Sequence, residues 1–354
     1  MSFNNEVIER LRSGPSQSAV DKFRTGMCKF WHPVALEKDL MAGKMLAVRL
    51  LETPIVLTRL DGELLAMLDV CRHYQAQLSL GEVVSIDGRQ AIQCPYHGWA
   101  YGQSGRCVRI PQFPKDRQIP ASAALPSFKV AEKLGLIWVC LDQNPTFDLP
   151  DFTEYDDPEF RILTLADAQP INASSIRLIM GTLDDTHFPW VHEGILGDRE
   201  HPEPPDHSVK REGNVLHVDY DMLQPPSLSS GATDGNWVKS TYLNQVHMPN
   251  VIKLEKITPS GRYFIWQATC PVDHCHTLNF WIFARDYDKN PERDNEYLDF
   301  SRHIREQDKV ILESQRPWLL PPFWSQIEMP MRPGDKPLVE YQRWLEELGI
   351  AGEL

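Results

Sequence analysis

The sequence predicts an α+β protein in two parts, an all-β segment followed by a mixed α+β segment. The first part carries short runs of β-type residues separated by turn residues. A stretch rich in proline and acid follows at 142–158, with no sustained period of either kind, which is typical of a linker. Beyond it, runs with helical period occur among strand-like runs, and 354 residues are enough to bury both cores.

Each element follows from its own residues. Runs of β-branched and aliphatic residues predict strands in the first part at 45–51, 55–58, 64–68, 91–93 and 136–141. The second part is predicted to hold a helix near 174–186, an aromatic hairpin at 263–269 and 278–285, and a helix at 295–314. The predicted division is an N-terminal extension at 1–29, a first domain at 30–142, a linker at 143–160 and a second domain at 161–354.

Composition excludes several classes of protein. Hydrophobic residues make up 42% and charged residues 24%, and the apolar runs are too short for a membrane span. The net charge of −13 opposes binding to nucleic acid or to an acidic membrane. The first residues show no basic start followed by an apolar stretch, and seven cysteines is an odd number, so we expect a cytoplasmic protein whose thiols are free or bind metal.

Two short motifs in the first part each combine one cysteine and one histidine. They are Cys71-Arg72-His73 and Cys94-Pro95-Tyr96-His97. A zinc finger more often pairs Cys with Cys and His with His in its local motifs. A two-iron cluster held by two cysteines on one iron and two histidines on the other needs this pattern. A mononuclear zinc site and a set of unrelated residues remain the alternatives.

A second group of candidate ligands lies in the second part of the chain. His187 and His192 follow two carboxylates, Asp184 and Asp185. In an unbroken α-helix the two histidines would lie about 140° apart and would not converge. Pro189 lacks the N–H that a helix interior needs, so we expect the helix to end or kink there and bring His192 round toward His187. On the residues alone, a surface position fits the two histidines as well as a metal site does.

The helix at 295–314 carries a carboxylate on its apolar face. At 100° per residue, one sector of about 80° contains Tyr297, Phe300, Ile304, Asp308 and Ile311. A carboxylate buried there is costly unless a cation or hydrogen bonds compensate it, and bound iron would do so. Pairing of Asp308 with a nearby basic residue at the helix end is the alternative.

The cysteine and histidine motifs resemble those of the Rieske oxygenases, down to the string Cys-Pro-Tyr-His-Gly-Trp at 94–99. The resemblance implies that Cys71, His73, Cys94 and His97 bind a [2Fe-2S] Rieske cluster. It also implies the family's fold, an all-β Rieske domain followed by an α+β catalytic domain with an antiparallel sheet. The likeness extends over nearly the whole chain and is strongest to the N- and O-demethylase branch.

The same resemblance assigns the second group. The family motif D-x2-H-x4-H matches Asp184, His187 and His192, and the segment 307–317 resembles the one that supplies a third ligand, at Asp308. Mononuclear Fe(II) is then expected on His187, His192 and Asp308, which is the two-histidine, one-carboxylate set. Asp184 is expected to be the catalytic bridge, hydrogen-bonded to His187 and to a cluster histidine of a neighbouring subunit.

Three departures from the family pattern stand out. The spacing of 20 residues between His73 and Cys94 is longer than usual. Tyr74-Gln75 replace a frequent Arg-Gly, and Gly181 replaces a frequent Asn three residues before the bridging aspartate. None of these changes removes a ligand, so both metal sites are expected to form.

The resemblance implies the terminal component of a multicomponent oxygenase. Such a protein activates O2, takes NAD(P)H-derived electrons from a separate reductase or ferredoxin, and forms a homotrimer. We expect it to oxidise a small aromatic or heterocyclic substrate, with N- or O-demethylation as the outcome. Ring or C–H hydroxylation or dioxygenation on the same scaffold is the first alternative, and a non-catalytic Rieske electron-transfer protein is the second.

Two further sequence features bear on partners and metals. A basic patch for an acidic redox partner is predicted around the cluster, and an ordinary solvated face is the alternative; its residues are Arg72, Arg106, Arg109 and Lys115. His274, Cys275 and His276 lie at the predicted hairpin turn and are expected to be surface residues.

Overall fold

The computed structural model describes residues 8–9, 11, 14–114, 116–164, 167–232 and 235–353. The chain divides into two compact units. One is Cys28–Asp148, and the other combines Leu149–Leu354 with Met1–Met27. The unit boundary therefore falls inside the proline-rich stretch, and helix α2 (Gln17–Met27) belongs to the second unit. Within the described ranges, no helix is long and apolar enough to cross a membrane.

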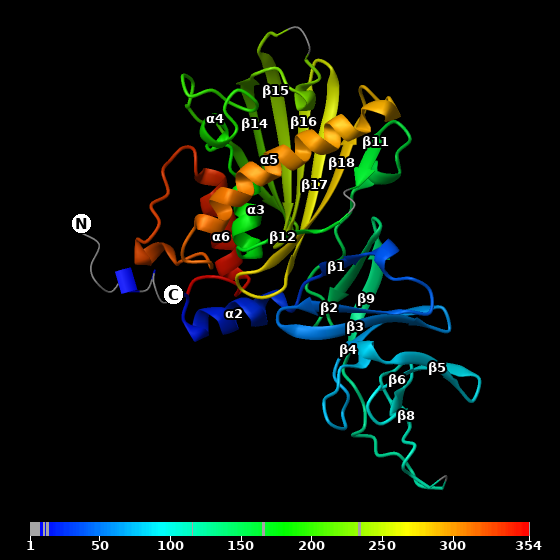
Figure 1. Ribbon diagram of the computed structural model, residues 1–354. Helices are drawn as coiled ribbons and strands as arrows, with labels where there is room; N and C mark the ends of the chain where they lie inside the picture. The colour runs from blue at the N-terminus through cyan, green and yellow to red at the C-terminus, as the bar shows by residue number, and fades with distance from the viewer. Residues whose placement is uncertain are drawn as a thin grey trace. The chain divides into compact units, whose positions relative to one another are not determined.

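The first unit is all β, in two antiparallel sheets (Figure 1). The larger sheet has the order β1-β10-β9-β4-β3-β2, and the smaller has the order β5-β6-β7-β8. Their bounds are β1 His32–Leu36, β2 Met45–Leu50, β3 Thr53–Leu60, β4 Glu63–Leu68, β5 Glu82–Ile86, β6 Arg89–Gln93, β7 Ala100–Tyr101, β8 Cys107–Arg109, β9 Ser127–Lys133 and β10 Leu136–Cys140. Short 3-10 turns cover Glu37–Asp39 and Leu78–Leu80.

Two hairpins of this unit follow from their turn residues. Asp61-Gly62 joins β3 to β4 and Asp87-Gly88 joins β5 to β6, and both residues of each pair have positive φ. Such two-residue turns match the twist of the strands that they connect. The five predicted strands are present, while β1, β5, β7, β8 and β9 were not predicted.

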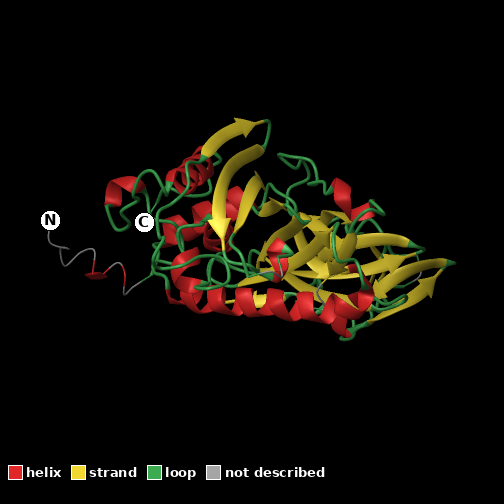
Figure 2. Ribbon diagram, turned by 90° about the horizontal axis from the view of Figure 1, so that it is seen from above, coloured by secondary structure: helices red, strands yellow, loops and turns green. Residues whose placement is uncertain are grey.

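The second unit is built on an eight-stranded antiparallel sheet with helices, so the predicted α+β class is confirmed. The strand order is β11-β18-β17-β16-β15-β14-β13, and β12 also pairs with β18. The bounds are β11 Arg161–Thr164, β12 Gln169–Ile171, β13 Ser208–Glu212, β14 Val215–Gln224, β15 Val238–His247, β16 Val251–Thr258, β17 Gly261–Pro271 and β18 Thr277–Arg285. The helices are α3 Ser175–Leu183, α4 Phe188–Val191, α5 Asp294–Ser314 and α6 Lys336–Glu347, with 3-10 turns at Thr153–Asp156, Leu228–Ser230, Pro291–Arg293 and Phe323–Ser325. Helix α5 runs along the sheet (Figures 1 and 2).

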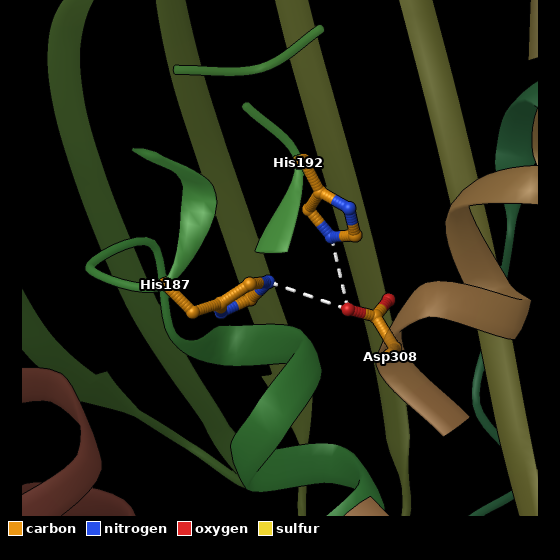
Figure 3. Close-up of side chains that lie close together, drawn as sticks. All are labelled: His187, His192 and Asp308. Atoms are coloured by element: carbon orange, nitrogen blue, oxygen red, sulfur yellow. Dashed lines mark ion pairs between the residues drawn. The ribbon is translucent and has the colours of Figure 1, made fainter. Parts of the chain in front are cut away.

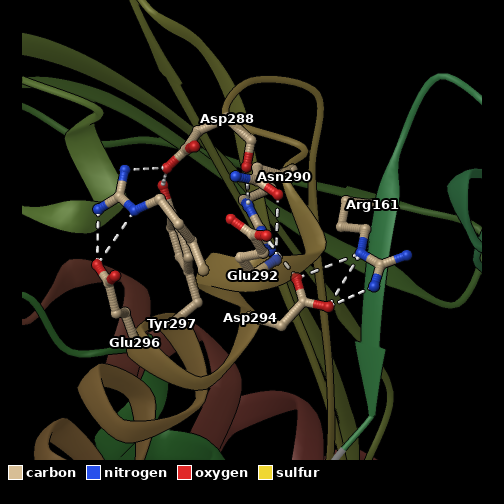
Figure 4. Close-up of polar contacts among 9 residues, drawn as sticks. Arg161, Asp288, Asn290, Glu292, Asp294, Glu296 and Tyr297 are labelled. Carbon is tan, nitrogen blue, oxygen red and sulfur yellow. Dashed lines mark hydrogen bonds and ion pairs between the residues drawn. The ribbon is translucent and has the colours of Figure 1, made fainter.

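The first turn of α5 is tied to the sheet by ion pairs (Figure 4). Asp294 accepts hydrogen bonds from Arg161 of β11, at 3.1 Å, and from Arg285 of β18, at 3.0 Å. The Arg285 guanidinium also lies 3.8 Å from the ring centroid of Tyr297, whose hydroxyl donates to Asp288 at 2.8 Å. These contacts fix where α5 starts, and therefore where its later turns lie over the sheet.

Two expectations about these helices were wrong. Helix α3 ends at Leu183, well before Pro189, and Pro189 lies in the first turn of α4, where its missing N–H costs nothing. On α5, Ile311 is 46% exposed, and the buried positions include Ser301 and Arg305. Arg305 is buried because its guanidinium lies over Trp281 and donates to Gln169, so the side of α5 that is buried most deeply is partly polar.

Candidate metal centres

Three side chains of the second unit meet at one point, His187, His192 and Asp308 (Figure 3). Asp308 Oδ1 lies 2.9 Å from His192 Nε2 and 3.4 Å from His187 Nε2. Both rings thus present the same nitrogen to one carboxylate oxygen. Two imidazoles and a carboxylate converging in this way fit mononuclear Fe(II), because they leave other positions of the ion open.

The local backbone explains how the two histidines converge. Asp184 leaves the helical conformation, with φ −70° and ψ 135°, and its Oδ1 accepts hydrogen bonds from the N–H and the hydroxyl of Thr186 at 2.9 and 2.7 Å. His187 then precedes the short helix α4 and His192 follows it. Because neither histidine lies inside a continuous helix, their ring centroids are 5.1 Å apart.

The second nitrogen of each ring has its own acceptor. His187 Nδ1 lies 3.1 Å from Asp184 Oδ2, and His192 Nδ1 lies 2.8 Å from Gln307 Oε1. A proton on Nδ1 in each ring leaves the Nε2 lone pair for a metal ion. The sequence analysis did not predict a role for Gln307. Its position next to Asp308 is the only feature of the sequence that points to this role.

The charges at this point favour a cation. Burial alone would lower the pKa of His187, but its hydrogen bonds to Asp184 and Asp308 outweigh burial and raise that pKa to about 9. Burial alone would raise the pKa of Asp308, yet the two histidines hold it below its ordinary value, and His187 does the same for the pKa of Asp184. Two carboxylates around one imidazole leave an excess of negative charge that a divalent ion would neutralise.

A cavity of about 680 Å³, including the part open to solvent, adjoins the three residues. His187, His192 and Asp308 form part of its lining, and most of the rest is aliphatic or aromatic. The predicted aromatic hairpin contributes Tyr263, Ile265 and Trp281 to this lining, while the intervening Phe264 and Trp266 are core residues. The cavity suits a flat apolar molecule.

The four candidate ligands of the first unit lie on two loops of similar geometry. Cys71 and His73 follow β4, and Cys94 and His97 lie between β6 and β7. In each loop the cysteine N–H donates to the carbonyl five residues on, and the cysteine carbonyl accepts from the N–H four residues on. The two loops therefore present one cysteine and one histidine each in the same way.

The donor atoms of these loops are grouped in pairs. His73 Nδ1 and His97 Nδ1 face each other at 3.1 Å, an arrangement that suits two ligands of one metal ion. Burial and then the neighbouring Cys94 raise the pKa of the Cys71 thiol. A tetrahedral zinc site would hold all four donors within about 4 Å of one another. Among the described residues, these donors form no group of three or more within 4.8 Å, which fits two metal ions better than one.

The loops also explain one departure from the family pattern. Gln75 and Gly98 occupy the same place, four residues after the cysteine, and both have positive φ, of 57° and 73°. This conformation favours glycine. This conformation explains why glycine is frequent at the position of Gln75 in the Rieske oxygenases that the chain resembles. Gln75 adopts the same backbone conformation at a cost in conformational free energy.

Neighbouring side chains complete the surroundings of the loops. Trp99 stacks on His73 at 4.8 Å between ring centroids, and the hydroxyl of Tyr101 lies 3.2 Å from Cys71 Sγ. Tyr101 was missed by the sequence reasoning, because a strand residue 30 positions from Cys71 is brought to it by the fold. Of the predicted basic patch, Arg72, Arg106 and Arg109 are exposed, and Lys115 lies outside the described residues.

The turn between β17 and β18 brings Asp273, Cys275 and His276 together. His276 Nδ1 lies 2.8 Å from an Asp273 carboxylate oxygen, and the backbone N–H groups of Cys275 and His276 donate to the same side chain. His276 is exposed, as expected, while His274 is half-buried beside Trp318. These hydrogen bonds account for the turn without a metal ion.

Comparison with known proteins identifies two domain families in the chain. Residues 30–129 match the Rieske [2Fe-2S] domain. Residues 171–351 match the vanillate O-demethylase oxygenase C-terminal domain. The first match contains the four loop residues, and the second contains the point where the two histidines and Asp308 meet.

Two curated relatives and one solved structure match almost the whole chain. Methylxanthine N1-demethylase NdmA of Pseudomonas putida is 32% identical over 340 residues, covering 94% of this chain and 92% of the relative. Methylxanthine N3-demethylase NdmB of the same organism is 31% identical over 342 residues, covering 93% and 91%. A structure of Pseudomonas putida NdmA with caffeine superimposes with a TM-score of 0.80 at 32% identity, covering 93% and 92%.

Proposed function

Because the chain belongs to the Rieske non-haem iron oxygenases, in their demethylase branch, we propose that it is a terminal oxygenase that removes a methyl group from nitrogen or oxygen of a small aromatic or heterocyclic substrate. The protein is an oxidoreductase of the monooxygenase type. The observation that carries the proposal is the convergence of His187, His192 and Asp308 beside a largely apolar cavity.

The cofactors of the protein are a Rieske [2Fe-2S] cluster and a mononuclear iron, with O2 as co-substrate. We propose Cys71, His73, Cys94 and His97 as the cluster ligands, and His187, His192 and Asp308 as the iron ligands. When bound, the cluster would supply electrons and the iron would activate O2.

The chain's own residues orient these groups. Asp184 and Gln307 accept the Nδ1–H of His187 and His192, which keeps both Nε2 atoms directed at the iron position. The cavity wall holds an apolar substrate next to that position and excludes bulk water. Asp184 is proposed as the catalytic bridge, with its carboxylate also accepting a hydrogen bond from a cluster histidine of a neighbouring subunit.

Electrons are proposed to arrive from a separate reductase or ferredoxin that draws on NAD(P)H. The exposed Tyr74 and Tyr96 flank the cluster histidines and, with Arg72, Arg106 and Arg109, offer a surface for docking. A cyclic homotrimer is the proposed assembly, because the bridge through Asp184 requires a neighbouring subunit.

Formaldehyde release tests the proposed reaction. A methyl group oxidised on nitrogen or oxygen leaves as formaldehyde, whereas hydroxylation of a ring or of an alkyl group attached to carbon releases none. We expect anaerobically purified protein to contain about three irons and two acid-labile sulfides per chain, and Asp308→Ala to lose one iron and keep the sulfide. If turnover of methylated substrates yields hydroxylated rings without formaldehyde, the reaction is hydroxylation and not demethylation.

A further inference from the structure

A buried lysine lies in the wall of the cavity beside the proposed iron ligands. Lys256 belongs to β16 and is 3% exposed. It shares the cavity lining with His187, His192 and Asp308. The sheet register places Tyr242 of β15 and Tyr263 of β17 directly opposite Lys256, and both tyrosines also line the cavity. Lys256 is therefore part of the cavity floor rather than of the core on the other face of the sheet.

Within the described part of the chain, the contacts of Lys256 do not include a carboxylate. Its Nζ donates to Ser229 Oγ at 3.1 Å and lies 5.8 Å from the ring centroid of Tyr242. Among the described residues, no aspartate or glutamate forms an ion pair with it. Asp308 lines the same cavity, but its carboxylate is directed at the two histidines. A hydroxyl and an aromatic ring satisfy an ammonium group less well than an anion does.

A second buried lysine of the same strand shows the usual arrangement. Lys253 lies three residues earlier, and its Nζ is 2.7 Å from Glu154 Oε1. Both lysines are less than a tenth exposed, yet among the residues that the structure describes a carboxylate pairs with Lys253 and none with Lys256. Burial lowers the pKa of Lys256 to about 7, the penalty expected for an ammonium group that is removed from water without a counter-ion.

We propose that Lys256 binds an anionic oxygen group of the substrate, so that the preferred substrates are methylated aromatic compounds that carry a carboxylate. This inference rests on the proposed function, because it takes the cavity to be the substrate site. Lys256 and the three proposed iron ligands line the same cavity, whose walls also include Tyr242 and Phe188. A carboxylate at Lys256 would therefore hold the substrate's ring inside this cavity, and the methyl group is expected at the end that faces the iron ligands.

Binding to the holoenzyme without turnover tests the proposal. Isothermal titration calorimetry on the iron- and cluster-loaded protein, under anaerobic conditions and without reductase, would compare 4-methoxybenzoate with the neutral 4-methoxybenzamide of nearly the same shape. We expect the carboxylate to bind at least about tenfold more tightly, as a charge-assisted hydrogen bond predicts. Equal or tighter binding of the amide, or failure of the carboxylate to bind, would overturn the proposal.

Two variants locate the preference at the lysine. Lys256→Met is expected to weaken binding of 4-methoxybenzoate by about tenfold or more and to change binding of 4-methoxybenzamide by less than about twofold. Lys239→Met is the matched control, because it removes one positive charge from the neighbouring strand at an exposed ion pair with Asp221. The same loss in both variants would refute a specific role for Lys256. The comparison of the two probes in the unaltered protein still decides the proposal if Lys256→Met fails to fold.

The outcomes separate this inference from the proposed function. Preferential binding of the carboxylate through Lys256, without formaldehyde release on turnover, would refute demethylation and leave the anion site in place. Formaldehyde release from a neutral substrate such as caffeine, combined with no preference for the carboxylate, would support demethylation and refute the role of Lys256.

Discussion

Gln307 holds the orientation of His192 in this structure. Its Oε1 accepts the Nδ1–H of His192 at 2.8 Å, and His192 is 1% exposed, so no bulk water can replace the bond. We expect Gln307→Leu to weaken Fe(II) binding by about tenfold to a hundredfold, with the cluster unchanged. A titration with Fe(II) would measure the affinity, and the visible spectrum would show whether the cluster is unchanged. Gln307→Glu keeps an acceptor oxygen and should retain most of the affinity; equal affinity of all three proteins would show that Gln307 has no positioning role.

Gln75 has a positive φ that costs conformational free energy, whereas Gly98, at the equivalent position of the other loop, adopts it without that cost. A residue with a Cβ atom at positive φ costs about 1–2 kcal/mol. Gln75→Gly is therefore expected to stabilise the cluster-bearing unit by about 1 kcal/mol, measured as a higher midpoint for loss of the cluster's colour in urea. Gly98→Ala should do the opposite, because its Cβ would also meet Pro111 Cγ at 3.1 Å. A lower midpoint for Gln75→Gly would mean that the glutamine side chain stabilises the loop.

At single positions, the resemblance to family motifs predicted what the residues alone left open. His187, His192 and Asp308 were predicted in this way, and the structure brings the three together. Gln307 and Lys256 were not singled out, because an amide or an ammonium acquires its role only from what the fold places beside it. Lys256 owes its position to the pairing of β16 with β15 and β17, which no local pattern encodes.

At the scale of elements, helices α3 and α5 approach closely at Gly181. A Cβ atom at Gly181 would lie 2.8 Å from Leu312 Cδ2, and Leu312 is one helical turn beyond Asp308. Glycine at 181, in place of the family's frequent asparagine, therefore leaves space for the Leu312 side chain where α3 and α5 meet. The predicted boundary of α3 was wrong for a reason of the same kind. The hydrogen bonds of Asp184 to Thr186 end the helix, and its sequence period does not reveal them.

A double-mutant cycle tests this packing. In Gly181→Ala, the higher helix propensity of alanine should stabilise the folded protein by up to about 1 kcal/mol, and the clash with Leu312 should offset this. We therefore expect little change in the free energy of unfolding. We expect the clash with Leu312 to shift α5 and with it Asp308, and so to lower kcat/KM by about tenfold or more. Gly181→Ala combined with Leu312→Ala should recover activity relative to Gly181→Ala alone. Purely additive effects on kcat/KM would mean that the contact does not position Asp308.

At the scale of the whole molecule, the proposed trimer places a cluster and an iron from different chains in one reaction unit. Cys71→Ser would remove the cluster and leave the iron ligands, while Asp308→Ala would remove the iron and leave the cluster. Each variant alone is expected to be inactive. In co-expressed mixed trimers, an interface is productive only when an Asp308→Ala chain supplies the cluster and the neighbouring Cys71→Ser chain supplies the iron. With equal expression this holds at about a quarter of the interfaces, so about a quarter of the wild-type rate should be restored. Electron transfer within one chain would give no recovery in any mixture, because neither variant then holds both metal centres, and the bridging role of Asp184 between subunits would have to be abandoned.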